Sequence, residues 1–223
     1  MKKSVIAIVL SLSSVALMSA ENPVILYVGD SHSYGKLGGT VEKNLSGVSS
    51  KVVMHASCGA TPNTWLGTLK YEKTVCGYWM KEGETEVRLK EHQTPKFKDE
   101  LARLRPDVTI IQLGTNIAAS SKPQNAQASI EVMMKAVSTE GSKCIWVGPP
   151  DANSKVVTRA KVIEVNKMIS NLASKNGCEY IDSLKLTKFP ANNSEGIHYP
   201  PNLSTEWGVK VSAEVLKIIK TYQ

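Results

Sequence analysis

The sequence predicts a three-layer α/β/α domain around a central five-stranded parallel sheet. Short apolar runs of strand length alternate with longer segments of helical periodicity, a pattern typical of strands joined by helical crossovers. Such crossovers return each strand parallel to the one before. Small and polar residues directly follow several of these runs, at the sheet edge where α/β proteins bind ligands.

The five predicted strands are short, apolar and rich in β-branched residues. The first, Val-Ile-Leu-Tyr-Val at 24–28, has no polar interruption, as expected for a strand buried on both faces. The other four are predicted at residues 51–56, 108–113, 144–147 and 179–181.

The segments between the strands carry apolar residues at the three- and four-residue spacing of a helix with one buried face. Residues 61–94 are the least regular part, and we expect loops there together with a short hairpin. The predicted helices cover about residues 38–45, 95–104, 124–137, 155–175 and 204–220.

Residues 1–20 are expected to form a signal peptide, leaving 21–223 as a single domain. Two lysines precede an apolar run that ends at Leu17, and the small residue Ala20 offers a cleavage site. The run is short for a membrane anchor and contains serines, so no membrane span is expected after cleavage. The expected location is therefore periplasmic or secreted.

Four cysteines in an exported chain favour two disulfides over free thiols. Cys144 and Cys178 each begin a predicted strand, and parallel neighbours would bring those starts together. Cys58 and Cys76 bracket one loop, so we prefer 58–76 with 144–178 among the three pairings. No close Cys-x-x-Cys pair occurs, which disfavours a zinc site, and no metal is expected.

The formal net charge of +7 is mild and scattered along the chain. No dense Lys/Arg block or nucleic-acid motif occurs, so no nucleic-acid partner is expected. Such a charge suits work near anionic polymers or membranes, or serves solubility alone.

Residues suited to acyl transfer lie just past predicted strands or, in the case of His198, before the last predicted helix. Ser31 is a candidate nucleophile, which needs a neighbouring base to become reactive. His198 is the candidate base, and Glu195 three residues earlier could orient its imidazole. The backbone N–H groups of Ser31 and Gly59 and the side-chain amide of Asn116 are candidate oxyanion donors. Because the ends of parallel strands share one edge, these groups can converge.

These residues fall in four blocks that resemble those of the GDSL, or SGNH, esterase and lipase family. Gly-Asp-Ser at 29–31 resembles the first block, with His32 where leucine is commoner. Gly59 resembles the second block, and Gly-Thr-Asn at 114–116 matches the third. Glu-Gly-Ile-His at 195–198 resembles the last, where the family usually has Asp-x-x-His.

The resemblance implies the flavodoxin-like SGNH fold, ester hydrolysis through an acyl-enzyme on Ser31, and no cofactor. Glu195 is one methylene longer than the usual aspartate. Two interpretations therefore stay open, a Ser-His-Glu triad and a Ser31–His198 dyad helped by a backbone carbonyl.

Three further side chains are candidates for substrate contact. His32 adjoins the nucleophile, although it could equally be satisfied by its own turn. Trp65 and Trp79 lie in the irregular region, where their rings could stack on sugars, line an acyl pocket or pack in the core. Trp146 and Trp207 lie on a strand and a helix and are expected in the core.

Together these features predict an exported serine esterase that removes a small acyl group, such as acetyl, from a cell-envelope glycan. A lipase or thioesterase of the same family is one alternative. Another is an O-acyltransferase that uses the same residues to acylate a sugar hydroxyl. A catalytically silent glycan-binding protein is a third, motivated by Glu195.

Overall fold

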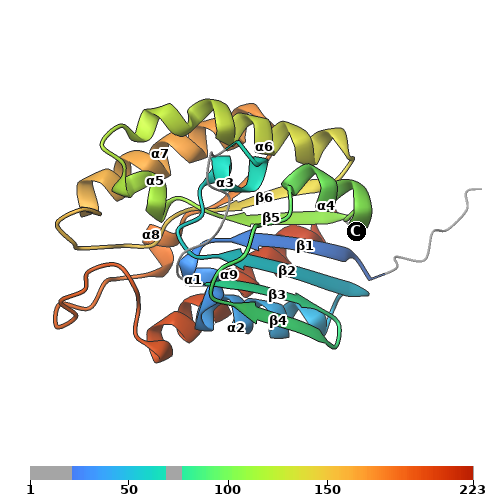
Figure 1. Ribbon diagram of the computed structural model, residues 1–223, viewed down its shortest axis with the longest axis horizontal. Helices are drawn as coiled ribbons and strands as arrows, with labels where there is room; N and C mark the ends of the chain where they lie inside the picture. The colour runs from blue at the N-terminus through green and yellow to red at the C-terminus, as the bar shows by residue number, and fades with distance from the viewer. Residues whose placement is uncertain (1–21, 69–76, 223) are drawn as a thin grey trace, which may run out of the picture.

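The computed structural model describes residues 22–68 and 77–222. In this part of the chain, a seven-stranded sheet lies between two layers of helices (Figure 1). Its strand order is β4-β3-β2-β1-β5-β6-β7. The helices α4, α6 and α7 cover one face, and α2 and α9 cover the other. The predicted three-layer α/β/α fold is therefore confirmed.

Five of the strands are parallel, as the sequence predicts, and they form four neighbouring pairs that run from β2 to the edge strand β7. The first of them lies in the middle of the sheet and ends at Gly29, two residues before Ser31. They are β1 (Val24–Gly29), β2 (Lys51–Ser57), β5 (Val108–Gln112), β6 (Lys143–Val147) and β7 (Glu179–Ile181).

The prediction of five strands was wrong in number. β3 (Tyr78–Glu82) and β4 (Thr85–Leu89) form an antiparallel hairpin that extends the sheet beyond β2. Gly83, with φ of +58°, lies in the two-residue turn between them, a position that favours glycine. Most side chains of β4 are exposed, so this strand is defined by main-chain pairing with β3. Such pairing leaves no apolar run in the sequence from which the strand could be predicted.

The helices follow the predicted segments closely. In α7 the predicted apolar face is buried, and Thr158 caps the helix by accepting a hydrogen bond from the Lys161 N–H. The helices are α1 (Ser31–Tyr34), α2 (Lys36–Ser46), α3 (Pro62–Leu66), α4 (Phe97–Leu104), α5 (Thr115–Ala119), α6 (Gln127–Thr139), α7 (Arg159–Lys175), α8 (Ser183–Leu186) and α9 (Pro201–Lys220), with a 3₁₀ turn at Pro123–Ala126.

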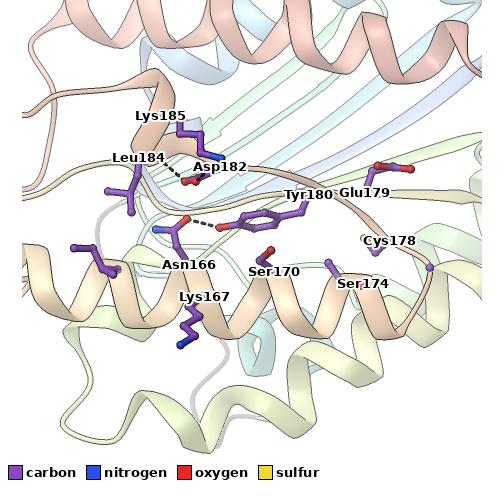
Figure 2. A pocket seen from close by; sticks show the side chains of 13 residues that line it. Asn166, Lys167, Ser170, Ser174, Cys178, Glu179, Tyr180, Asp182, Leu184 and Lys185 are labelled. Carbon is purple, nitrogen blue, oxygen red and sulfur yellow. Dashed lines mark hydrogen bonds and ion pairs between the residues drawn. The ribbon is translucent and has the colours of Figure 1, made fainter.

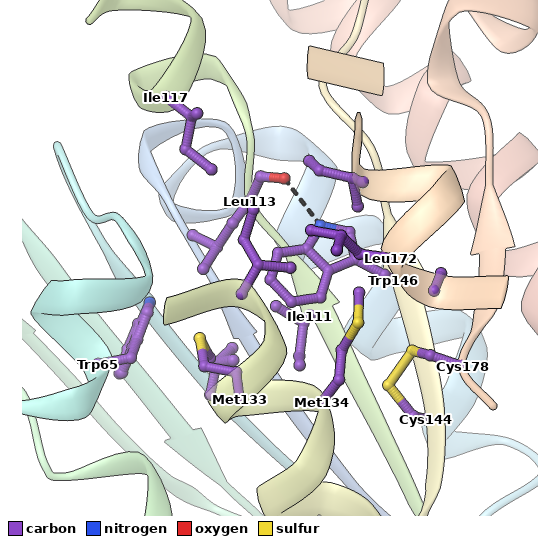
Figure 3. Close-up of a cluster of buried hydrophobic side chains, with 14 of the residues drawn as sticks. Trp65, Ile111, Leu113, Ile117, Met133, Met134, Cys144, Trp146, Leu172 and Cys178 are labelled. Atoms are coloured by element: carbon purple, nitrogen blue, oxygen red, sulfur yellow. Dashed lines mark hydrogen bonds between the residues drawn. A yellow bond between two sulfur atoms is a disulfide. The ribbon is translucent and has the colours of Figure 1, made fainter. Parts of the chain in front are cut away.

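Two hydrophobic clusters fill the space on either side of the sheet. Figure 3 shows the one beneath α6 and α7, where the indole N–H of Trp146 donates to the Leu113 carbonyl at 3.0 Å. Trp207 belongs to the opposite cluster, with α2 and α9. The expectation that both tryptophans lie in the core is confirmed.

Trp65 and Trp79 are also core residues, with 0% and 2% of their surface exposed. A substrate-stacking role for these rings was therefore the wrong alternative, because neither ring face is open to a sugar. Trp79 in addition donates its indole N–H to Glu86 at 2.9 Å. Burying large aromatic surface stabilises the fold, which explains why they pack inward.

The structure contains the Cys144–Cys178 disulfide, whose Cα atoms are 4.6 Å apart at the starts of the neighbouring strands β6 and β7. Cys76, the predicted partner of Cys58, lies outside the described residues, as does the predicted signal peptide. Within residues 22–68 and 77–222, no helix combines the length and apolar character needed to cross a membrane.

Candidate active site

The turn after β1 presents Ser31 as the first residue of α1. Asp30 caps this short helix, because its carboxylate Oδ1 accepts the His32 N–H at 3.0 Å. The Asp30 side chain is fully buried, while Ser31 is only half-buried. Burial raises the pKa of Asp30 to about 7. The capping residue is thus part of the core, and the serine beside it faces outward.

A buried hydrogen-bond chain holds the same turn against the sheet. Ser33 Oγ donates to Gln112 Oε1 at 2.6 Å and lies 2.8 Å from the Tyr27 hydroxyl. A Cβ at Gly29 would lie 2.2 Å from Ser33 Oγ, so only glycine fits there. The sequence analysis missed Gln112. The signal that could have drawn attention to it is its amide side chain at the end of the otherwise largely apolar strand Val-Thr-Ile-Ile-Gln.

His198 reaches this turn from the loop before α9. Its Nε2 lies 2.9 Å from Ser31 Oγ, and its Nδ1 lies 2.7 Å from Glu195 Oε1. The structure therefore brings together the three residues predicted to form a triad. This arrangement has the connectivity by which a carboxylate orients an imidazole and the imidazole activates a hydroxyl.

The longer side chain of Glu195 is accommodated because it turns back on its own loop. Its second oxygen, Oε2, accepts the backbone N–H groups of Ile197 and His198. Burial alone would raise its pKa, but these two hydrogen bonds and the His198 imidazole hold the pKa of Glu195 below its ordinary value. The carboxylate is thus ionised where it meets the imidazole.

Further hydrogen bonds fix this loop, and the sequence analysis missed them. The Asn193 side chain donates to the His198 carbonyl and accepts the Glu195 N–H, both at 3.0 Å. The Asn153 N–H donates to the Gly196 carbonyl at 2.8 Å. Gly196 has φ of +80°, and a Cβ there would lie 2.7 Å from the Asn153 carbonyl oxygen. Glycine is therefore required at 196.

The two remaining blocks contact each other through a hydrogen bond. Asn116, on α5, donates one amide hydrogen to the Ala60 carbonyl at 3.0 Å. Because an amide carries two hydrogens, one is left to donate elsewhere. Gly59 adopts φ of +77°, and the position of its missing Cβ is open space. The hydrogen bond thus joins the second and third blocks at a place where backbone can approach a ligand.

The sequence model of the GDSL-like lipase/acylhydrolase family matches residues 28–202. The chain belongs to this family. The assignment makes it an ester hydrolase.

Solved structures agree on the fold of this GDSL-like hydrolase. It resembles an aryl esterase from M. smegmatis (TM-score 0.62, 18% identity, covering 87% of this chain and 98% of that one). It also resembles a carbohydrate acetylesterase from Sinorhizobium meliloti (TM-score 0.62, 16% identity, covering 87% of this chain and 99% of that one). A third similar structure is a lipase/acylhydrolase from Enterococcus faecalis (TM-score 0.56, 17% identity, covering 86% of this chain and 94% of that one). No curated protein sequence matches significantly.

Relative to the GDSL-like pattern, His32 is the unusual residue of the first block. Its ring lies 5.2 Å from that of His198, but only 5% of its surface is exposed. Burial therefore argues against the direct substrate contact considered for His32.

The site of this GDSL-like hydrolase is open. The side chains of His198 and Glu195 are 50% and 49% exposed.

A cavity of about 770 Å³ lies away from these residues, between α7 and the edge strand β7 (Figure 2). Its polar lining is already satisfied in part, since the Tyr180 hydroxyl donates to Asn166, and neither Ser31 nor His198 contributes to it. Among the described residues, no group of three or more His, Cys, Asp or Glu side chains is arranged to hold a metal.

Proposed function

We propose that this protein is an exported serine esterase that removes a small acyl group, such as acetyl, from a cell-envelope glycan. The hydrogen-bonded series Ser31 Oγ, His198 and Glu195, with distances of 2.9 and 2.7 Å, carries this proposal. Each distance is within the range that proton transfer and imidazole orientation require.

In the proposed mechanism, His198 Nε2 takes the Ser31 proton as Oγ attacks the ester carbonyl. The anionic Glu195 stabilises the imidazolium that forms. The N–H groups of Ser31 and Gly59 and the second amide hydrogen of Asn116 donate to the oxyanion. The imidazolium then protonates the leaving alcohol, which departs and leaves an acyl group on Ser31.

A water molecule completes the reaction. His198 removes its proton as it attacks the acyl-enzyme carbonyl, and the same donors stabilise the second oxyanion. Collapse of this intermediate returns the proton to Ser31 and releases the carboxylic acid. No step in this sequence needs a cofactor.

The openness of the site supports a large alcohol portion in the ester. With half of the His198 and Glu195 side chains exposed, a bulky glycan can approach from solvent.

Export is supported by the Cys144–Cys178 disulfide, because such bonds persist chiefly in oxidising compartments. The open site also favours hydrolysis over O-acyl transfer, since water reaches the acyl-enzyme freely. The intact hydrogen-bond series argues against a silent glycan-binding protein. The similarity to a carbohydrate acetylesterase is consistent with a glycan substrate.

The proposal is tested with nitrophenyl esters of increasing acyl length beside an acetylated peptidoglycan, using Ser31→Ala as the matched control. We expect the highest kcat/KM for the acetyl ester, acetate release from the glycan, and neither with Ser31→Ala. A fluorophosphonate probe should label the protein at Ser31. Absence of labelling, or a preference for long acyl chains, would overturn the corresponding part of the proposal.

A further inference from the structure

The ring of His32 fills the space between the His198 loop and helix α9. Its centroid lies 5.2 Å from the His198 ring at an interplanar angle of 49°. On its other sides it meets the Trp207 ring at 5.3 Å and 76° and the Tyr199 ring at 6.5 Å and 60°. His198 thus has solvent on one side and an aromatic ring on the other.

The surroundings of His32 hold this ring in place. Its backbone N–H is bound to buried Asp30, and the neighbouring residue in α1 is Ser31. Trp207, against which it packs, is itself fixed by an indole N–H bond to Ser183 Oγ at 3.2 Å. The rigid helix that carries Ser31 therefore also carries the contact with His198.

Burial and nearby charged groups determine the protonation state of the His32 ring. Burial, and next the proximity of His198, lower the pKa of His32 to about 3, while Glu195 opposes the shift weakly. The other ionisable groups near His32 are Asp30, which caps α1, and Tyr199 in the loop before α9. Helix α9 itself contributes the uncharged Trp207. His32 is therefore neutral at the pH values where an imidazole base works.

We infer that His32 is a positioning residue whose neutral ring supports His198 and stabilises its imidazolium form during proton transfer. The inference rests on the proposed function, in which His198 becomes cationic. A cation over the face of Trp, Tyr or Phe, within about 6 Å of the ring centroid, is attracted by roughly 0.5–1 kcal/mol. The neutral imidazole of His32, 5.2 Å from the His198 ring, is inferred to act in the same way. Leucine, the commoner residue here, supplies bulk but no such attraction. The proton stays on His198, and His32 neither gives nor takes one.

The test compares three variants in the full chain. His32→Leu removes the ring and keeps apolar bulk, His32→Phe keeps a ring without nitrogens, and His32→Gln keeps polarity without a ring. We expect kcat for acetyl esters to fall about two- to five-fold in the Leu and Gln variants, with KM unchanged. The Phe variant should stay close to wild type.

The pH profile separates this role from a merely structural one. Losing a ring that stabilises the imidazolium makes the protonated, inactive form less favoured. The acid limb of kcat/KM should therefore move to lower pH by roughly half a unit in the Leu and Gln variants, and stay in place in the Phe variant. Thermal melting checks that each variant is folded at the assay temperature.

An unmoved acid limb in folded His32→Leu would overturn the inference, as would wild-type behaviour of His32→Gln. These outcomes are distinct from failure of the proposed function, which Ser31→Ala reports separately. If Ser31→Ala abolishes turnover while the His32 variants are silent, only the positioning role is lost.

Discussion

The turn after β1 and the loop that carries His198 meet at one hydrogen bond, yet they are built differently. In the turn, Asp30 and Ser33 are fully buried, and side chains from the sheet hold Ser33. In the loop, Glu195 and His198 are half-exposed and are held largely by the loop's own amides and Asn193. The turn that presents Ser31 is thus anchored in the core, whereas His198 is supplied from the surface. Changes at the buried Asp30 and Ser33 should therefore reduce stability, and changes in the loop should mainly affect chemistry.

The largest effect is expected where the two regions meet. Ser31→Ala and His198→Ala should each lower kcat by roughly 10⁴–10⁶, and the double variant should lose little more, because the groups act as a unit. Single-turnover kinetics with nitrophenyl acetate measures this. Additive losses in the double variant would mean that the two side chains act independently.

Glu195 tests the loop alone. We expect Glu195→Ala to lower kcat by about 10³–10⁴, since the imidazole loses its orienting carboxylate, with only a small change in Tm because the side chain is half-exposed. Glu195→Asp should recover only part of this loss. It restores a carboxylate, but the shorter side chain cannot both reach His198 Nδ1 and accept the loop N–H groups. Near wild-type kcat in Glu195→Ala would demote the triad to a Ser31–His198 dyad.

Asn116, which donates to the Ala60 carbonyl from α5, tests the candidate oxyanion donors. Asn116→Ala should reduce kcat by about 10²–10³, the usual effect of removing one such donor. KM for acetyl esters should change little, because the donor acts on charge that develops in the transition state. A rise in KM with unchanged kcat would place Asn116 in ground-state binding instead.

A matched pair of alanine variants compares the two regions directly. Ser33→Ala removes the buried hydrogen bonds that Ser33 Oγ makes with the Tyr27 hydroxyl and with Gln112 Oε1, which should cost about 1–3 kcal/mol of stability. Asn193→Ala removes loop hydrogen bonds in an exposed segment and should barely change stability while lowering kcat. Urea unfolding and steady-state kinetics on both variants separate the two effects. Equal stability losses would contradict the contrast between core and surface.

The last expected effect concerns the stability of the buried turn and its dependence on pH through Asp30. Because the pKa of Asp30 is raised to about 7 from 3.8, the folded state keeps a proton that the unfolded state has lost between those values. This contribution to stability is present at low pH and disappears as pH rises through 7. Asp30→Asn cannot titrate, so its stability relative to wild type should increase from pH 4 to pH 8, by a few kcal/mol at most. Tm measured across this range for both proteins provides the check, and parallel curves would contradict it.

Much of the fold and site is visible in the sequence, because burial and turn chemistry leave local patterns. The apolar run at 24–28 predicted the central strand. The small polar blocks after the strands and before the last helix indicated Ser31, Asn116 and His198 as candidate site residues. These signals need only residues adjacent along the chain. The pairing of Cys144 with Cys178 likewise followed from two strand starts.

Other features depend on contacts between distant segments. The β3–β4 hairpin joins the sheet through main-chain pairing, and the orientation of Trp65 into the core depends on helices that cover it. Ser31 and His198 are 167 positions apart, and only folding brings them to 2.9 Å.

The sequence by itself determined the layered α/β architecture, the family and the chemical types available for acyl transfer, because each is written in local periodicity and spacing. Only the tertiary structure decided that Glu195 can reach His198 while accepting its own loop amides. It also decided that His32 is a buried neighbour of the imidazole. Both depend on distances across the fold, which no local pattern encodes.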